Sequence, residues 1–369
     1  MWNRRQVVRI LSSSLLSAVL VAAGCNYRGE DTEREKDNFA VSSTVKTAIG
    51  AGGSTFIAPI MNNWITAYQQ MHPNTLINYR PIGSGAGLEE FKKTLLGFAA
   101  SDAPLNDQDI RQMFPVIQIP VTAGPVCAIY NVPGLTTPLK LSAATLAGIF
   151  LGNIISWQDP AIERDNPGVK LPRAALIIVH RSDGSGTTSI FSSYLAKVSP
   201  EWSRRAGQGL TLNWPVGIGQ EGSKGVLEFV KQNPGTIGYA ELNYAKEKGL
   251  PVASIQNRAG GFVVPSPVSA TAAIEAFGDA LAKDARTPIV DPPASAKDAY
   301  PIAGLTFLLA PKDGSDAQQR RALRDFFQYT ITTGQDSAES LSYAKLPKSL
   351  QQQDLNLLAS LTADGQPLK

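Results

Sequence analysis

The sequence predicts an α/β protein with two domains. Strand-like apolar runs, such as 76–79 and 175–179, alternate with runs whose apolar residues recur at helical spacing. The 369 residues exceed the roughly 100–200 residues of one domain. Hydrophobic residues make up 43% and charged residues 18% of the chain, with 32 Gly and 25 Pro. This composition is typical of a compact, loop-rich protein and excludes a disordered chain or a coiled coil.

Residues 1–24 are predicted to be a signal peptide. Arg4, Arg5 and Arg9 form a positive start, and the apolar stretch that follows is too short for a membrane span of about 20 residues. The segment closes with Leu-Val-Ala-Ala-Gly before Cys25, which is similar to a lipobox, where the cysteine is lipidated and becomes the new N-terminus. The alternative is ordinary secretion with cleavage just before this cysteine. The sequence leaves Sec or Tat export open.

Residues 25–45 are predicted to be a flexible, lipid-anchored tether, because they are polar and show no helical or strand period. The protein is therefore expected on the periplasmic or cell-surface side of the membrane. The whole chain has 34 basic and 31 acidic residues; without the three arginines of the signal peptide the two numbers are equal. A formally neutral surface argues against a nucleic-acid partner.

The two cysteines do not have the spacing of metal ligands, so neither a metal nor a cofactor is expected. Cys127 lies in an apolar run and is expected to be a small buried residue. The two histidines, His72 and His180, are expected to be structural.

A first Gly-rich loop, 50–56, runs into a predicted helix with Pro59 in its first turn. The apolar residues of that helix recur at helical spacing: Ile60, Met61, Trp64, Ile65 and Tyr68. Thr55 and Phe56 would offer backbone N–H groups at this helix start, and Thr55 also a hydroxyl.

A second loop, 83–87, follows the predicted strand 76–79 and leads into a helix-spaced set: Leu88, Phe91 and Leu95. Glycine allows the backbone to approach a ligand closely, and Ser84 adds a donor. The run Gly-Ser-Lys-Gly at 222–225 is superficially similar but lacks the P-loop spacing. It is predicted to be a turn before a helix that starts at Val226.

Two further loops follow predicted strands. One strand ends in Ser101 and Asp102, and a carboxylate beside anion-binding loops is useful if the anion carries a proton. Another strand stops at Arg181, and Ser185 and Thr187 then stand at a helix start, with Gly between them. The first turn of a helix has unpaired N–H groups and a partial positive charge, so small residues there expose donors to an anion. Any single loop could merely cap its helix, but three such starts and an arginine together indicate an oxyanion site.

These loops resemble the substrate-binding proteins of high-affinity phosphate (Pst) ABC transporters. The resemblance spans about 50–347 and is carried by motifs in the same order: 54–59, 82–85, 100–105, 149–152 with Trp157, 181–187, 192–198, 214–217 and 234–239. It implies a two-lobed periplasmic-binding-protein fold of type II, with mixed sheets, flanking helices and a central cleft. The implied lobes are 46–121 plus 299–369, and 122–298.

The resemblance also implies roles for individual residues. Phosphate oxygens would accept hydrogen bonds from six of them: Thr55, Phe56, Ser84, Ser185, Gly186 and Thr187. Arg181 would pair with the anion, Asp183 would hold Arg181, and Asp102 would accept the proton of the bound phosphate. The implied function is capture of inorganic phosphate and delivery to the permease subunits and ATPase of an ABC transporter, without catalysis.

The same residues support phosphate on physical grounds. Phosphate at neutral pH carries a proton and sulfate does not, so a buried carboxylate accepts a hydrogen bond from the one and repels the other. The alternatives are a phosphate-ester hydrolase that uses Ser185, and a protein that binds another oxyanion. The hydrolase would need a histidine base, but His72 and His180 are both expected to be structural, and the sequence shows no metal cluster for a phosphatase.

Overall fold

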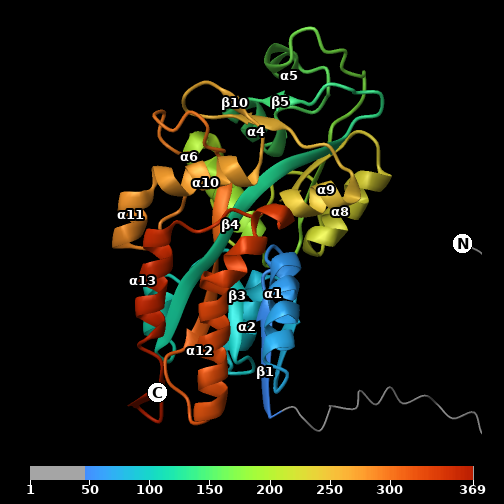
Figure 1. The fold of residues 1–369 in the computed structure, drawn as a ribbon. Helices are drawn as coiled ribbons and strands as arrows, with labels where there is room; N and C mark the ends of the chain where they lie inside the picture. The colour runs from blue at the N-terminus through green and yellow to red at the C-terminus, as the bar shows by residue number, and fades with distance from the viewer. Residues whose placement is uncertain (1–45, 369) are drawn as a thin grey trace, which may run out of the picture. The chain divides into compact units, whose positions relative to one another are not determined.

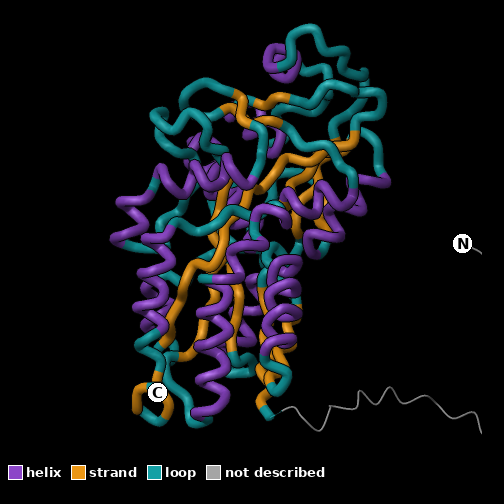
Figure 2. The backbone as a smooth tube through the Cα atoms, viewed as in Figure 1, coloured by secondary structure: helices purple, strands orange, loops and turns teal. Residues whose placement is uncertain are grey.

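The computed structural model describes residues 46–368, and most of their strands belong to one mixed sheet (Figures 1 and 2). Its eight strands lie in the order β2-β1-β3-β11-β4-β8-β6-β7. They are β1 (Thr47–Gly53), β2 (Thr75–Arg80), β3 (Phe98–Ser101), β4 (Val116–Asn131), β6 (Ile177–Arg181), β7 (Ile218–Gln220), β8 (Thr236–Glu241) and β11 (Ala303–Pro311). Short strands form two small sheets: β5 (Lys140–Leu141), β9 (Ser254–Gln256) and β10 (Phe262–Val263), and β12 (Thr362–Ala363) with β13 (Gln366–Pro367).

The helices lie on both faces of this sheet. They are α1 (Ala58–Met71), α2 (Ser84–Lys92), α3 (Asp107–Arg111), α4 (Ala143–Phe150), α5 (Pro160–Asp165), α6 (Gly186–Val198), α7 (Pro200–Arg205), α8 (Gly222–Gln232), α9 (Leu242–Lys248), α10 (Pro267–Ala276), α11 (Gly278–Lys283), α12 (Ala317–Ile331) and α13 (Lys348–Leu358). Two 3₁₀ turns, Thr333–Ser337 and Glu339–Leu341, follow α12.

Strand β4 joins the two halves of the sheet, as the long diagonal arrow of Figure 1 shows. Its first part, from Val116 to Pro125, pairs antiparallel with β11. Its second part, from Val126 to Asn131, pairs antiparallel with β8. One continuous strand therefore belongs to both halves, and its pairing partner changes between Pro125 and Val126.

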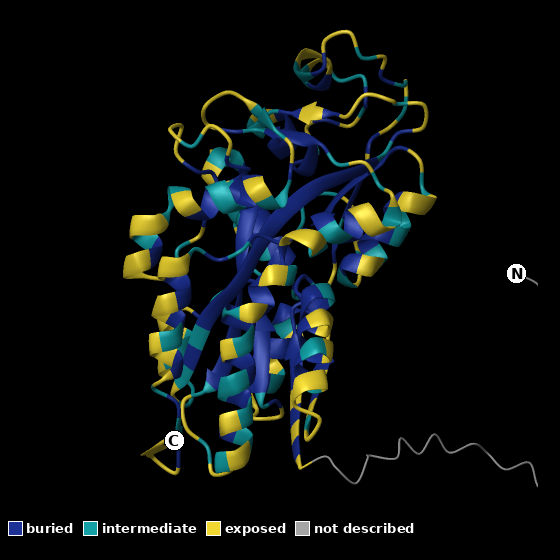
Figure 3. Ribbon diagram, in the orientation of Figure 1, coloured by how far each residue is buried: buried dark blue, intermediate teal, exposed yellow. Residues whose placement is uncertain are grey.

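The half that contains β1, β2, β3 and β11 has a core on each face. Successive side chains of β3 point to opposite faces of the sheet. Phe98 and Ala100 therefore pack in one cluster and Ala99 in the other. The first cluster includes Trp64 of α1 and Phe327 of α12. The second includes residues of α2, α10 and α13, among them Phe91, Ile274 and Leu350. Figure 3 shows the resulting pattern, with dark strands between helices whose outer faces are exposed.

The half that contains β6, β7 and β8 is built in the same way. Tyr239 of β8 stacks on Phe191 of α6, with ring centroids 4.4 Å apart. The next residue, Ala240, faces the opposite side and packs with Val226 and Val230 of α8. Both β1 with β3 and β6 with β7 and β8 pair in parallel, so their carboxyl ends meet at common edges. Ligands of open α/β sheets bind at such edges.

The local predictions are confirmed with two exceptions. The helix after the first loop is α1, and its five predicted apolar residues are all buried. The predicted strands are β2, β3 and β6, and Cys127 is buried. Leu95 was placed on the second helix, but α2 ends at Lys92 and Leu95 is exposed. The helix expected from Val226 begins at Gly222, because glycine and serine tolerate the first helical turn as well as a turn.

Among residues 46–368, no helix is both long and apolar enough to cross a membrane. The predicted signal peptide, the lipidation site Cys25 and the tether up to residue 45 lie outside the described residues.

Candidate functional site

Asp102 follows β3 and is 5% exposed, and three hydroxyl groups surround its carboxylate. The Ser54 hydroxyl lies 2.7 Å from both carboxylate oxygens. Thr306 of β11 donates to Oδ1 at 2.7 Å, and Ser84 lies 3.4 Å from Oδ2. Because the sequence prediction did not include Ser54 or Thr306, the structure adds two residues to this environment.

The pKa of Asp102 is raised from 3.8 to about 7. Burial is the main cause, and hydrogen bonds from Thr306 and Ser54 oppose it. The charge of Glu241 raises the pKa further, and that of Arg181 lowers it. Among the described residues no cation forms an ion pair with Asp102, so this carboxyl group can exchange its proton near neutral pH.

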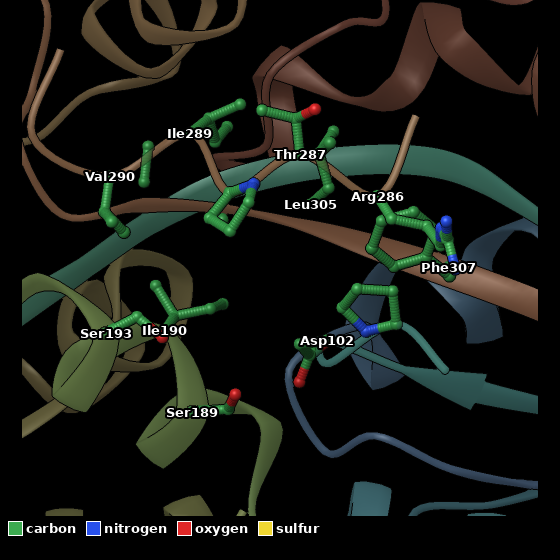
Figure 4. Close-up of a pocket in the computed structure, with 14 residues that line it drawn as sticks. Asp102, Ser189, Ile190, Ser193, Arg286, Thr287, Ile289, Val290, Leu305 and Phe307 are labelled. Carbon is green, nitrogen blue, oxygen red and sulfur yellow. The ribbon is translucent and has the colours of Figure 1, made fainter. Parts of the chain in front are cut away.

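A small cavity of about 80 Å³ reaches Asp102 (Figure 4). Its walls are Ser189, Ile190 and Ser193 of α6, the segment 286–290, and Leu305 and Phe307 of β11. The volume is enough for several water molecules. Asp102 is the only predicted site residue in its lining, so this cavity is not the predicted site itself.

Arg181 ends β6, is 3% exposed, and is held on several sides. Its Nε donates to Asp183 at 2.7 Å, and its Nη2 donates to the other oxygen of that carboxylate at 2.5 Å. Its Nη1 donates to Ser223 at 3.1 Å and lies 3.4 Å from the Thr55 hydroxyl. The guanidinium of Arg181 is therefore fixed by Asp183 and reaches the first loop from the other half of the sheet.

The pKa of Asp183 is below its ordinary value of 3.8. Burial alone would raise it, but the hydrogen bond and charge of Arg181 outweigh that effect. The N–H of Gly222 also donates to Oδ1 of Asp183, at 3.0 Å. The carboxylate of Asp183 therefore interacts with Arg181 and with the start of α8.

The start of α6 lies directly against Asp102. Ser185 caps the helix, and its hydroxyl accepts the N–H of Thr188 at 3.1 Å. A Cβ atom on Gly186 would lie 2.4 Å from Oδ2 of Asp102 and 2.5 Å from the Ser84 hydroxyl oxygen. Only glycine fits this contact, and it brings the positive end of α6 to the carboxyl ends of β1 and β3.

Four backbone donors at the site are free. Within residues 46–368, no hydrogen bond to another protein group engages the N–H of Phe56, Ser84, Gly186 or Thr187. All four residues are buried, and three of them lie in the first turn of a helix. Buried N–H groups normally have a partner, so these donors are suited to an anion.

The two halves meet at the site. Gly85 donates its N–H to the carbonyl of Gly184 at 2.9 Å, and the Tyr244 hydroxyl donates to the Thr55 carbonyl at 3.0 Å. A larger cavity of about 550 Å³ opens beside these contacts. One wall includes Thr55 and residues of α1, and the other includes Asp183, Ser223 and Tyr244.

All of the predicted site residues therefore lie around one region of contact between the halves. The sequence prediction missed Ser54, Thr306, Tyr244, Ser223 and Glu241, and also Tyr239, whose hydroxyl accepts the backbone N–H of Arg181 at 3.1 Å. Ser54 and Ser223 had a usable signal, since Ser54 belongs to a Gly/Ser-rich run before α1 and Ser223 to one that forms the first turn of α8. Thr306 and Glu241 lie within apolar strands far along the chain, and no local pattern marks them.

The fold and this site define a class, the two-lobed binding protein with a cleft between its lobes. Residues 39–333 match the PBP superfamily domain. A relative from Xylella fastidiosa, named "Phosphate-binding protein PstS", is 38% identical over 92% of this chain and 94% of its own length. A relative of the same name from Methanocaldococcus jannaschii is 36% identical over 94% and 93%. The chain belongs to the PBP superfamily and, within it, to the PstS family.

Solved structures agree on the fold. A high-affinity periplasmic phosphate-binding protein (PfluDING), solved with bound phosphate, has a TM-score of 0.70 at 22% identity and covers 86% of this chain and 96% of its own. A phosphate ABC transporter substrate-binding protein from Clostridium perfringens has a TM-score of 0.58 at 17% identity, with coverage of 81% and 100%.

Proposed function

We propose that this protein is exported, captures inorganic phosphate in the cleft between its lobes, and delivers it to the permease subunits of an ABC transporter with their ATPase. The observation that carries this proposal is the contrast within one site. Asp102, a buried acceptor with a pKa of about 7, lies against the start of α6 and its free N–H donors, and the guanidinium of Arg181 reaches Thr55 of the neighbouring loop. A tetrahedral anion that still carries a proton satisfies both kinds of group.

Each predicted residue has a role in this proposal. The N–H groups of Phe56, Ser84, Gly186 and Thr187 would donate to phosphate oxygens, as would the hydroxyls of Thr55 and Ser185. Arg181 would pair with the anion through its planar guanidinium, which Asp183 holds in position. Asp102 would accept the phosphate proton.

The lobes would close around phosphate, because the anion touches groups from both halves. We propose 46–121 plus 299–369 as one lobe and 122–298 as the other, with β4 and the segment just before β11 as the connections. Helices α10 and α11 belong to the second lobe by chain position, but they pack with α2 and α13 of the first. We therefore expect these two helices to move with the first lobe.

We further propose that the protein binds and releases phosphate without chemical change, and that a lipid on Cys25 retains it at the membrane. The main rival would be a hydrolase with Ser185 as nucleophile. The Ser185 hydroxyl caps α6, and the ring of His180 stacks on Trp214 with centroids 4.6 Å apart. His72 stacks on Tyr68 at the end of α1. Neither histidine of the described chain is placed as a base for Ser185.

Titration calorimetry with phosphate and sulfate tests the proposal. Wild-type protein is expected to bind phosphate and to reject sulfate. Asp102→Asn should bind phosphate more weakly and lose discrimination, because an amide does not repel a fully ionised oxygen. Wild-type binding of sulfate as tight as that of phosphate would contradict the role of Asp102, and binding of neither would contradict the function.

A further inference from the structure

Three consecutive carbonyl groups just before α1 each accept a hydrogen bond from the hydroxyl of a different buried tyrosine. The pairs are Tyr79 with Ser54 at 2.7 Å, Tyr244 with Thr55 at 3.0 Å, and Tyr343 with Phe56 at 2.5 Å. A carbonyl has no proton, so the hydroxyl is the donor in each pair. Since a hydroxyl has only one proton, these three hydroxyls act as donors to the loop and not to a bound anion.

The hydrogen bond from Tyr244 acts on a peptide group that faces the site. The Thr55 carbonyl and the Phe56 N–H belong to the same peptide group, and the described residues contain no cis peptide bond. In a trans peptide the C=O and N–H groups point in opposite directions. A donor that fixes the Thr55 carbonyl therefore also fixes the direction of the Phe56 N–H, one of the free donors of the site. It also polarises the peptide and strengthens this N–H as a donor.

Of the three tyrosines, Tyr244 comes from the other half of the sheet. Tyr79 belongs to β2, which pairs with β1 beside the loop, whereas Tyr244 belongs to α9 and packs with Val226 of α8 and Ala240 of β8. The preceding residue of α9, Asn243, donates to the hydroxyl of Tyr343 at 3.2 Å. Helix α9 therefore reaches the loop twice, once directly and once through Tyr343. Both contacts cross between the halves and exist only while the halves are together.

The surroundings of Tyr244 keep its hydroxyl protonated. Burial raises the pKa of Tyr244, and the negative charge of Glu241 raises it further. The side chain also lines the larger cavity beside Thr55, on the opposite wall. Its proton is engaged by the Thr55 carbonyl, so the hydroxyl supports the loop from across the cleft.

We propose that Tyr244 is a positioning residue for the ligand: when the lobes close, its hydroxyl holds the Thr55 carbonyl and thereby directs the Phe56 N–H at an oxygen of the bound anion. Asn243 supports the same loop through Tyr343. Neither side chain touches the anion in this scheme. The inference rests on the proposed binding of phosphate between the lobes. It predicts that α9 governs how slowly phosphate leaves and not how quickly it enters.

The test measures association and dissociation rates of radiolabelled inorganic phosphate by rapid filtration, for the full chain of wild type, Tyr244→Phe and Asn243→Ala. Tyr244→Phe removes one hydroxyl and keeps the ring. Its dissociation rate should rise about fivefold, as expected for one hydrogen bond, with an association rate within about twofold of wild type. The bond is absent while phosphate enters the open cleft. Asn243→Ala should show the same pattern with a smaller rise, about twofold.

Tyr68→Phe is the matched control. Its hydroxyl also donates to a carbonyl, that of Ala322 at 3.5 Å, but at the far end of α1, so both rates should stay near wild type. Thermal unfolding without phosphate checks that each variant is folded, and Asn243→Ala decides the question if Tyr244→Phe is not.

An unchanged dissociation rate in folded Tyr244→Phe would overturn the proposal. A fall in its association rate as large as the rise in its dissociation rate would overturn it too, because the hydroxyl would then order the loop before closure. If wild-type protein binds no phosphate, the proposed function itself fails.

Discussion

Asp102 and Asp183 are the same residue type in the same site, yet their pKa values move in opposite directions. Asp183 contacts the guanidinium of Arg181 through both carboxylate oxygens, and its pKa falls. Within residues 46–368, the side chains that hydrogen-bond to the Asp102 carboxylate are hydroxyl groups, and burial raises its pKa to about 7. Asp102 is the more deeply buried of the two, at 5% exposed against 21% for the Asp183 side chain, and it lacks a cationic partner, so burial and the partner both contribute to the difference.

The comparison separates two tasks that a carboxylate can have beside an anion. Asp183 neutralises and orients a cation, and its charge is used within the protein. The carboxylate of Asp102 remains available as a hydrogen-bond acceptor, because the described part of the protein supplies no cation that pairs with it. We expect changes to the Arg181 and Asp183 pair to alter how strongly any oxyanion binds, and changes to Asp102 to alter which oxyanion binds.

The largest expected effect is that of Arg181→Ala. It removes the cation and leaves the partly buried Asp183 without its partner, so phosphate affinity should fall by about a thousandfold or more, about 4 kcal/mol. Calorimetry at constant salt measures this, with Arg80→Ala as a control because Arg80 pairs with Glu90 on the surface. An affinity within a few-fold of wild type would remove Arg181 from the site.

A smaller effect should appear in stability without ligand. The pKa of Asp102 is about 7 in the folded protein against an ordinary value of 3.8. The folded state therefore holds this proton between about pH 4 and 7, where the unfolded chain releases it. Its contribution to the free energy of unfolding is fully present below about pH 4 and is lost as pH rises through 7. For about three pKa units the loss is at most about 4 kcal/mol, and we expect about 2 kcal/mol.

Urea unfolding of wild type and Asp102→Asn at pH 5 and pH 8 measures this contribution. The variant should gain stability relative to wild type at pH 8, because it lacks the buried charge. Asp183→Asn is the matched comparison and should have the opposite sign. The lowered pKa of Asp183 gives stability that is present above its unfolded value and lost in acid, so this variant should be less stable than wild type at pH 8. If both variants shift in the same direction, the contrast between the two carboxylates is wrong.

Cys25→Ser should leave both carboxylates and the phosphate affinity unchanged. The protein should move from the membrane fraction to the soluble fraction after cell disruption, because the lipid-accepting thiol is lost. Immunoblots of the two fractions measure the change, with Cys127→Ser as the control. A variant that stays in the membrane fraction would contradict the lipobox prediction.

Much of the site could be predicted from the sequence, because many of its groups belong to short local motifs. A Gly-rich run before an apolar helix predicts where free N–H groups occur, and the structure places the starts of α1, α2 and α6 at these loops. Arg181 and Asp183 are two residues apart, so their pairing also lies within reach of a local motif. The run at 222–225 was read as a turn because its spacing fits no nucleotide motif. In the structure this run begins α8, and its Ser223 accepts a hydrogen bond from Arg181.

Local pattern in the chain therefore determined the α/β alternation, the helix starts and the identity of the charged groups. Tertiary structure alone decided the environment of each charge. Asp102 meets Thr306, which is 204 residues away along the chain, and Glu241 meets Thr187 across 54 residues. Such contacts depend on strand order in the sheet and on the passage of β4 between its halves. A pKa depends on burial and on neighbours in space, and one-dimensional spacing specifies neither for residues so far apart.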